Sequence, residues 1–331
     1  MSDVLALAAE LVAIPSLTRE EGAVADFVGR WLEQRGWRVT MQEVGVGRRN
    51  VWATRKGGGV TMSTHLDTVP PFIAPRVEGD RLYGRGSCAA KGIAAAMMIA
   101  APRLADAGEE RVDLLFVVGE ERGSDGARAA NELPATSRYL INGEPTESRL
   151  ASGCKGALRV TVRTTGREAH SAYPDLGASA ILPMCDLLAE LKTLTLPVDD
   201  QLGPCTINVG LIRGGSAPNV IPGECEAELL VRMVSDRAPV EAALAAWASG
   251  RATLEYGLYI PAEHFHTVPG FAVAPMAYTS DIPLLTRWGK PLLFGPGSIH
   301  VAHTTTEFVA VDELRDAVDA YERLVHHLLA Q

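Results

Sequence analysis

Cysteine is sparse in this 331-residue sequence and follows no motif. The cysteines are an odd number, widely scattered, with no Cys-x-x-Cys pair: they are Cys88, Cys154, Cys185, Cys205 and Cys225. Such usage argues against a disulfide framework and against a cysteine zinc site, and it is typical of reduced thiols in a cytoplasm. We therefore predict a cytoplasmic protein.

Long apolar runs and an excess of positive charge are also missing. No stretch approaches the length of a membrane span, and the first residues lack the basic start of a signal peptide, with Glu10 among apolar residues at helical spacing. Lys and Arg number 31 against 40 Asp and Glu, a formal net charge of -9. This deficit argues against a nucleic-acid partner and against an electrostatic membrane anchor.

Two cofactor motifs are lacking as well. The sequence has no Gly-x-Gly-x-x-Gly at the first strand–helix turn and no Gly-x-x-x-x-Gly-Lys-Ser/Thr anywhere. Because these glycine-rich loops cradle dinucleotides and phosphates, their absence argues against a cofactor-dependent α/β enzyme.

Strands and helices alternate in two separate stretches of the chain, 1–154 and 259–331. Apolar periodicity predicts an α/β domain with a mixed, largely parallel sheet, whose ligand sites lie beyond the carboxyl ends of the strands. The predicted strands are 37–43, 50–55, 60–63, 112–118 and 138–142, and the predicted helices are 3–14, 18–35, 91–106, 124–132 and 311–329.

The segment 155–258 has a different pattern. Its elements follow the order β-α-β-β-α-β, which is typical of a compact ferredoxin-like sandwich. They are strand 157–164, helix 176–192, strands 205–212 and 224–233, helix 236–248 and strand 252–260. We predict a discontinuous catalytic domain, 1–154 plus 259–331, with a smaller domain inserted at 155–258.

Histidines and carboxylates gather where the predicted strands end. Imidazole nitrogens and carboxylate oxygens are ligands that suit zinc or cobalt. A lone member of this set would more often be structural, but the set as a whole favours a metal site. Its members are His65, Asp67, Glu120, Glu121, Glu144 and His303.

His65 and Asp67 are two residues apart on an extended segment, so their side chains face the same way. The imidazole of His65 can bind the metal through one nitrogen while Asp67 accepts a hydrogen bond from the other nitrogen. That hydrogen bond would set the tautomer and the orientation of the imidazole.

Seven segments give the chain a specific resemblance that extends over nearly its whole length. In order and spacing the chain resembles the dinuclear zinc family of aminoacylase, acetylornithine deacetylase, succinyl-diaminopimelate desuccinylase and related carboxypeptidases. The resemblance implies a zinc-peptidase-like catalytic domain with an inserted lid and dimerisation domain. The segments are STHLDTVP (63–70), LYGRGSCAAKG (82–92), GEERGSDGA (119–127), INGEPT (141–146), GREAHSAYPDLGASA (166–180), GGSAPNVIPGECEAELLVR (214–232) and AHTTTEFV (302–309).

The resemblance implies two zinc or cobalt ions. His65 and Glu144 would bind one of them, and Glu121 and His303 would bind the other. The metals would lower the pKa of a bridging water and polarise the acyl oxygen of the substrate.

Two further residues of the cluster take other roles by resemblance. Glu120 would be the general base, accepting a proton from the water and delivering it to the leaving amine. Asp67 would orient His65.

The inserted domain would supply three more functional residues. By resemblance, His170 would stabilise the oxyanion in the partner subunit of a homodimer. Asn219 and Arg232 would contact the substrate, with Arg232 suited to a bidentate grip on an α-carboxylate. The alternative for Arg232 is a salt bridge within the sheet.

The sequence departs from the family pattern at Ala89, where family members carry an aspartate that bridges the two metals. Alanine offers no lone pair, and two dications about 3.5 Å apart repel strongly unless carboxylates offset their charge. We therefore predict reduced metal occupancy and impaired hydrolysis.

The expected reaction is hydrolysis of the amide bond of a small N-acyl amino acid. Deacetylation of N-acetylornithine or N-acetylcitrulline in amino-acid (arginine) biosynthesis ranks first. The alternatives within this class are N-acetyl-lysine or carrier-bound lysine hydrolysis, succinyl-diaminopimelate desuccinylation and dipeptide cleavage. An alternative of another class is a non-catalytic protein that binds an acylated amino acid, although retention of Glu120 counts against it.

The sequence gives a weaker indication of the residues that would form the pocket for the substrate's amino-acid side chain. Tyr278, Ser280 and Asp281 are candidates. An acidic residue there would favour cationic ornithine or lysine, but Asp281 could equally be a helix N-cap.

Overall fold

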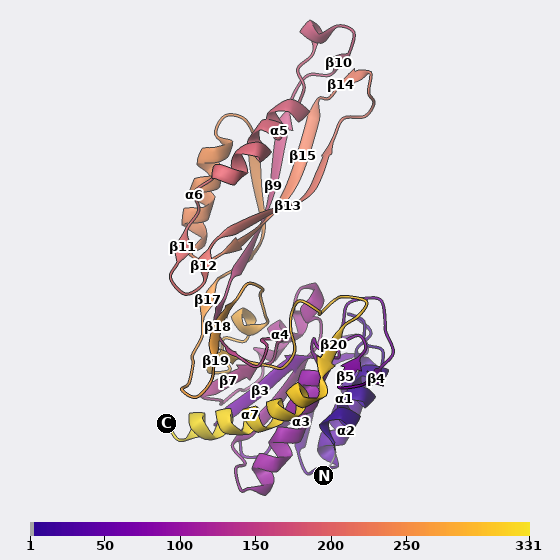
Figure 1. The fold of residues 1–331 in the computed structure, drawn as a ribbon, viewed down its shortest axis with the longest axis vertical. Coiled ribbons are helices and arrows are strands. Elements are labelled where there is room, and N and C mark those ends of the chain that lie inside the picture. The colour runs from indigo at the N-terminus through magenta and orange to yellow at the C-terminus, as the bar shows by residue number, and fades with distance from the viewer. Residues whose placement is uncertain (1–2) are drawn as a thin grey trace. The chain divides into compact units, whose positions relative to one another are not determined.

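A computed structural model describes residues 3–331 of the chain (Figure 1). The chain forms two compact units. The first contains residues 3–152, Phe265–Ala274 and Ser280–Gln331, and the second contains Gly153–His264 and Pro275–Thr279. Within residues 3–331, no helix is both long and apolar enough to cross a membrane.

The first unit is built on a six-stranded mixed sheet with the order β1-β2-β6-β3-β7-β19. Strands β6, β3, β7 and β19 run parallel to one another, whereas β1–β2 and β2–β6 are antiparallel. This confirms the predicted fold class. The strands are β1 (Arg38–Gly45), β2 (Arg48–Thr54), β3 (Val60–His65), β6 (Val112–Val117), β7 (Tyr139–Asn142) and β19 (Lys290–Leu293).

Helices cover both faces of this sheet. Along β6, Leu114 and Phe116 pack in the larger core, while Leu115 and Val117 pack in a smaller core with Trp288. Because strand side chains alternate between faces, a strand covered on both sides is largely apolar, and β6 is apolar except for Asp113. The larger core contains α1 (Val4–Ala13), α2 (Gly22–Glu33), α3 (Lys91–Asp106) and α7 (Val311–Leu329), and the smaller contains α4 (Asp125–Ala130).

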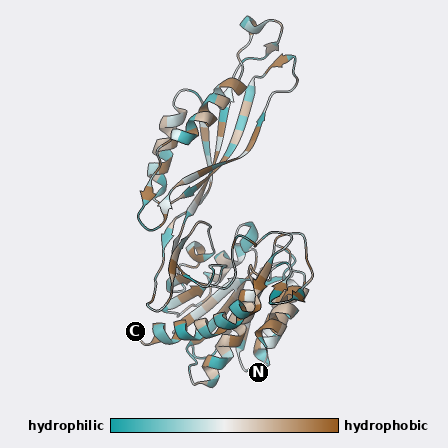
Figure 2. Cartoon of the chain, viewed as in Figure 1, coloured by the Kyte–Doolittle hydropathy of each residue, from teal (hydrophilic) through white to brown (hydrophobic). Residues whose placement is uncertain are grey.

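The second unit has a four-stranded antiparallel sheet with the order β13-β15-β9-β16. Leu158, Val160 and Val162 of β9 face the core formed with two helices, and polar residues alternate with them, so hydropathy alternates along the strand (Figure 2). The unit's elements are β9 (Gly156–Thr165), α5 (Ile181–Glu190), β13 (Thr206–Gly214), β15 (Glu224–Met233), α6 (Arg237–Ala248) and β16 (Thr253–Ile260).

Short elements complete the chain. The strands are β4 (Arg76–Glu78), β5 (Arg81–Tyr83), β8 (Leu150–Cys154), β10 (Ala169–His170), β11 (Val198–Asp199), β12 (Gly203–Pro204), β14 (Val220–Ile221), β17 (Glu263–His264), β18 (Val273–Met276) and β20 (Phe308–Ala310). The 3-10 turns are η1 (Glu120–Arg122), η2 (Pro174–Leu176), η3 (Leu191–Thr193) and η4 (Ile282–Leu284).

The structure corrects two predicted boundaries. The second unit contains Gly153–His264 and Pro275–Thr279 rather than residues 155–258, and β17 (Glu263–His264) pairs with Gly153 and Cys154 at its start. Helix α2 begins at Gly22 rather than residue 18, because the segment before it makes tertiary contacts: the Thr18 hydroxyl donates to Asp67 Oδ2 (2.8 Å).

Candidate metal centre

The predicted cluster forms at one edge of the first unit's sheet. Strand β3 ends at His65, β6 ends just before the turn that carries Glu120 and Glu121, and β7 ends just before Glu144. Since β3 is parallel to both β6 and β7, the three carboxyl ends meet at the same edge. The topology therefore brings together side chains that are 79 residues apart between His65 and Glu144.

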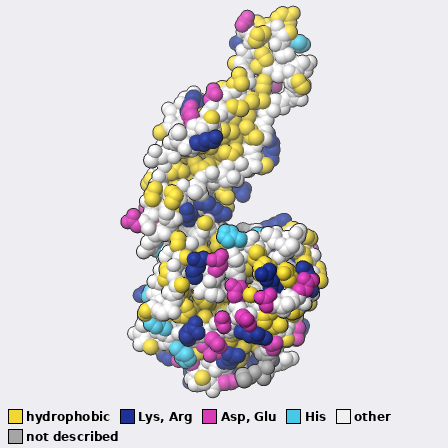
Figure 3. Space-filling view, in the orientation of Figure 1, with side chains coloured by type: hydrophobic (Ala, Val, Ile, Leu, Met, Phe, Trp, Pro, Cys, Tyr) yellow, Lys and Arg dark blue, Asp and Glu magenta, His cyan; other side chains and the backbone are white. Residues whose placement is uncertain are grey.

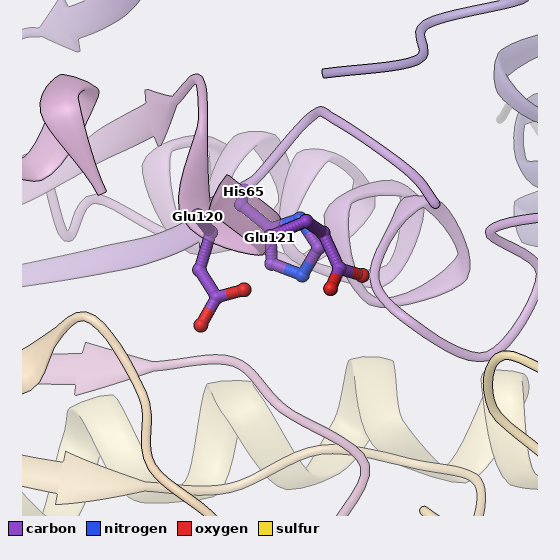
Figure 4. A group of neighbouring side chains, drawn as sticks. All are labelled: His65, Glu120 and Glu121. Carbon is purple, nitrogen blue, oxygen red and sulfur yellow. The ribbon is translucent and has the colours of Figure 1, made fainter. Parts of the chain in front are cut away.

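The ligand atoms of this cluster are close enough to share a metal ion. One atom each from His65, Glu120 and Glu121 lie within 4.8 Å of one another (Figure 4). His65 Nε2 is 3.9 Å from Glu144 Oε1, and His303 Nε2 is 2.7 Å from Glu121 Oε1. Two imidazoles and three carboxylates thus converge, a donor set that fits zinc or cobalt.

Hydrogen bonding leaves one nitrogen of His65 free for a metal. His65 Nδ1 lies 2.9 Å from the backbone oxygen of Asp67 and 3.4 Å from its Oδ1. A carbonyl oxygen can only accept, so Nδ1 carries a proton, and Nε2, which lies near Glu144, is the nitrogen that a metal would bind in place of a proton.

Asp67 also organises the turn that carries the two adjacent glutamates. Its Oδ1 accepts from the Glu120 amide (3.0 Å) and its Oδ2 accepts from the Glu121 amide (3.2 Å). The sequence analysis did not anticipate this role, because the pattern His65-x-Asp67 shows only the local pair. One carboxylate therefore fixes both the imidazole and the Glu120–Glu121 turn.

The charges of the cluster favour a cation. Burial, reinforced by the Glu144 carboxylate, raises the pKa of Glu120 well above its usual value, and burial raises the pKa of Glu144 to about 8. Burial opposes the protonation of His65, but the Asp67 and Glu144 carboxylates raise its pKa. A dication would offset the crowded negative charge, so its binding would release protons from these groups.

The loop that contains Ala89 is held by a buried carboxylate that the sequence analysis missed. Glu307 Oε1 accepts from the amides of Gly86 (3.0 Å), Cys88 (3.1 Å) and Ala89 (3.2 Å), and its Oε2 accepts from Arg85 (2.6 Å). The backbone at position 89 is therefore fixed by Glu307 and does not depend on the side chain that this position carries.

The side chain of Asp281 does not cap η4. It precedes η4 without making a side-chain cap hydrogen bond in the described chain, and Ser280 Oγ instead accepts from the Ile282 amide (3.4 Å). Asp281 is buried, and its carboxylate contributes to the raised pKa values of Glu120 and Glu144. Asp281 thus stands at the N-cap position of η4, but its side chain does not make the cap that the sequence analysis considered.

The remaining predicted residues lie in the second unit. His170 in β10 pairs with Val220 of β14, and the Ser171 amide donates to the Asn219 oxygen (3.0 Å), so His170 and Asn219 are neighbours. Arg232 lies in β15 between Ala157 and Thr206.

The salt bridge considered for Arg232 does not form. Within residues 3–331, Arg232 makes no ion pair with a carboxylate, and burial lowers its pKa.

Comparison with known proteins gives a consistent assignment. Residues 152–252 match the family model of the peptidase dimerisation domain of M20 proteins. A peptidase M20 domain-containing protein of Schizosaccharomyces pombe is 37% identical over 340 residues, with 99% of this chain and 85% of that protein covered. A protein of Aspergillus clavatus named as a probable carboxypeptidase is 34% identical over 375 residues, with 99% of this chain and 83% of that protein covered.

Solved structures share the fold. A tripeptidase from Staphylococcus aureus has a TM-score of 0.84 at 20% identity, with 99% of this chain and 98% of that chain covered. An M20 family metallo-carboxypeptidase from Sulfolobus solfataricus has a TM-score of 0.78 at 17% identity, with both chains fully covered. These solved structures and the curated relatives share a metallopeptidase-like hydrolase fold with this chain. The chain belongs to the M20 peptidase family.

Proposed function

We propose that the chain is a metal-dependent amidohydrolase that releases an amino acid from an N-acyl amino acid. The observation that carries this proposal is the convergence of His65, Glu121, Glu144 and His303 around a further carboxylate, Glu120, at one sheet edge. Four residues can hold zinc or cobalt there, which leaves one carboxylate for proton transfer.

The residues of the cluster have different roles in the proposed reaction. A bound zinc or cobalt ion would lower the pKa of a water molecule and polarise the acyl oxygen. Glu120 accepts the proton of the attacking water and delivers it to the nitrogen of the leaving amine. Asp67 keeps Glu120 in place through the Glu120 amide, and it keeps His65 in the tautomer that a metal requires.

The leaving group we favour is an α-amino acid with a free carboxylate. Arg232 has no carboxylate partner within the described chain and is suited to bind that group, His170 would stabilise the oxyanion, and Asn219 lies beside His170. Deacetylation of N-acetylornithine or N-acetylcitrulline is our first candidate. Removal of a carboxy-terminal residue from a peptide is the second, because curated relatives bear the name carboxypeptidase.

A substrate panel tests this proposal. We expect zinc-dependent release of ornithine or citrulline from the N-acetyl compounds, with lower kcat/KM for N-acetyl-lysine, N-succinyl-diaminopimelate and dipeptides. Blocking the α-carboxylate as an amide, or the substitution Arg232→Gln, should raise KM about 10- to 100-fold, the value of a charge-assisted pair. The panel is run on the chain and on its Ala89→Asp form. Preference for peptides would select the second candidate, and no turnover by either form would refute amide hydrolysis.

We further propose a homodimer formed through the second unit. Strand β13 is an edge of its sheet and pairs, within the described residues, with β15 alone. It exposes Val209 (40%), Leu211 (46%) and Ile212 (50%), and apolar side chains are visible on this unit in Figure 3. An exposed apolar edge strand is a template for pairing with a second copy.

The substitution Ile212→Lys should therefore dissociate the dimer. A charge buried at a symmetric apolar interface costs several kcal/mol, which corresponds to more than about a hundredfold in the dissociation constant. Light scattering after size exclusion measures the mass across a dilution series. Leu258→Lys is the matched control, because Leu258 is 45% exposed on the opposite edge strand, β16. A monomeric parent chain, or equal dissociation by both substitutions, would contradict this interface.

A further inference from the structure

Glu307 is a buried carboxylate from one chain segment that holds the backbone of another. Its exposed fraction is 1%, and its Oε1 accepts hydrogen bonds from the amides of Gly86, Cys88 and Ala89. Gly86 has a φ of +89°, a left-handed conformation of the kind that points nearby N–H groups toward one anion. The loop is thus a concave anion site, and the anion that fills it is a side chain of the same protein.

Arg85 completes this arrangement and extends it to His303. Its Nη1 donates to Glu307 Oε2 (2.6 Å), and its Nη2 donates to the backbone oxygen of His303 (3.5 Å). Its Nε donates to the backbone oxygen of Pro71 (3.3 Å). Arg85 is as deeply buried as Glu307, so water does not compete for these contacts. One planar guanidinium therefore connects the loop that carries Ala89 with the segment that carries His303.

The backbone of His303 needs such support. Its φ is +64°, a left-handed conformation that is uncommon for residues other than glycine and that persists where surrounding contacts fix it. One of these contacts is the hydrogen bond from Arg85. Another is the turn in which the Thr304 amide donates to the Val301 oxygen (3.3 Å). Because the imidazole of His303 meets Glu121, its direction in the candidate metal centre is set in part by Arg85.

We propose that Glu307 and Arg85 are positioning residues of the metal site that Glu121 and His303 form. Glu307 fixes position 89 through its amide, and Arg85 fixes His303 through its carbonyl oxygen. The pair thus holds two segments of the metal centre as one unit, and it acts on a metal through the ligands without touching it. The inference rests on the proposed function in that it requires a bound dication.

A purely structural ion pair is the competing role for Glu307 and Arg85. Glu21 and Arg48 form a comparable pair in the same unit, because Glu21 is buried and accepts two hydrogen bonds of 2.9 Å from Arg48. Within residues 3–331, neither Glu21 nor Arg48 is hydrogen-bonded to a candidate metal ligand, whereas Arg85 is bonded to His303. A structural role predicts similar effects of breaking either pair, and a positioning role predicts weaker metal binding for Glu307 alone.

Zinc affinity measured with a chromophoric chelator tests the proposal on the full chain. Glu307→Gln keeps the shape and removes the charge that Arg85 and the three amides contact, and we expect zinc to bind about 10- to 100-fold more weakly. The matched control is Glu21→Gln, which breaks a buried pair of the same kind and should change zinc affinity by less than about threefold. The melting temperatures of the metal-free variants measure the loss of stability separately.

Arg85→Lys is a second variant, which keeps a cation beside Glu307 and therefore retains the buried charge pair. One ammonium group cannot replace the planar fork that contacts both Glu307 and His303, so zinc should bind about 3- to 10-fold more weakly. If Glu307→Gln does not fold, Arg85→Lys decides the question by itself.

The visible spectrum of the cobalt-saturated protein adds a measurement that a loss of stability does not change. This spectrum depends on the number and arrangement of the ligands. We expect altered bands in Glu307→Gln and Arg85→Lys, and the spectrum of the parent in Glu21→Gln.

The outcomes distinguish failure of this inference from failure of the proposed function. Unchanged zinc affinity in both Glu307→Gln and Arg85→Lys, an equal loss of affinity in Glu21→Gln, or the parent's cobalt spectrum in all three variants would overturn the inference alone. A parent chain that binds neither zinc nor cobalt would overturn the inference and the proposed function together.

Discussion

The substitution Ala89→Asp is expected to raise zinc content from one ion to two per chain and to raise zinc-dependent hydrolysis of an N-acetyl amino acid by roughly two orders of magnitude. The new carboxylate would offset the repulsion between two dications. The loop can accept it, because the amides of Gly86, Cys88 and Ala89 are already held by Glu307, whatever the side chain at position 89.

Metal content by mass spectrometry and kcat on the substrate panel check this expectation. Ala89→Asn is the matched control, since it has the size of aspartate without the charge and should gain little. Equal turnover in the parent and the aspartate form would refute the assigned importance of position 89. Comparable metal with no turnover in either form would favour a non-catalytic protein that binds an acylated amino acid.

The second large effect is expected at Glu120. In the Ala89→Asp background, Glu120→Gln should lower kcat by about 10²- to 10⁴-fold, the usual contribution of a general base, while zinc content stays the same. Geometry alone does not separate a base from a ligand here, because atoms of His65, Glu120 and Glu121 all lie within 4.8 Å. The experiment separates them, because Glu121→Gln should lose zinc as well as activity.

A pH profile adds a specific signature of the base. Burial and the Glu144 carboxylate raise the pKa of Glu120, and a bound dication would oppose that rise. Only the ionised carboxylate accepts a proton, so kcat/KM should rise as pH increases through the pKa of Glu120. This rise of kcat/KM with pH should be absent in Glu120→Gln. A variant that keeps full activity, or that loses zinc as Glu121→Gln does, would show that Glu120 is not the base.

Much of the fold could be predicted because its signals are local. The apolar run of β6 and the alternation in β9 reflect burial on two faces and on one face of a sheet, respectively. Predicted boundaries were wrong where tertiary contacts take precedence over helical periodicity. Thr18 is in a helical pattern, yet its hydroxyl contacts Asp67, so the helix starts four residues later, at Gly22.

The sequence by itself determined which chemistry is available and where it gathers, because parallel strands carry whatever follows them to a common edge, here His65, Glu120 and Glu144. Only the tertiary structure decided which groups support them. Glu307 reaches the Ala89 amide across 218 residues, a contact that no motif in the sequence indicates. Compensation of buried charge depends on distances in space, and a linear pattern does not encode those distances.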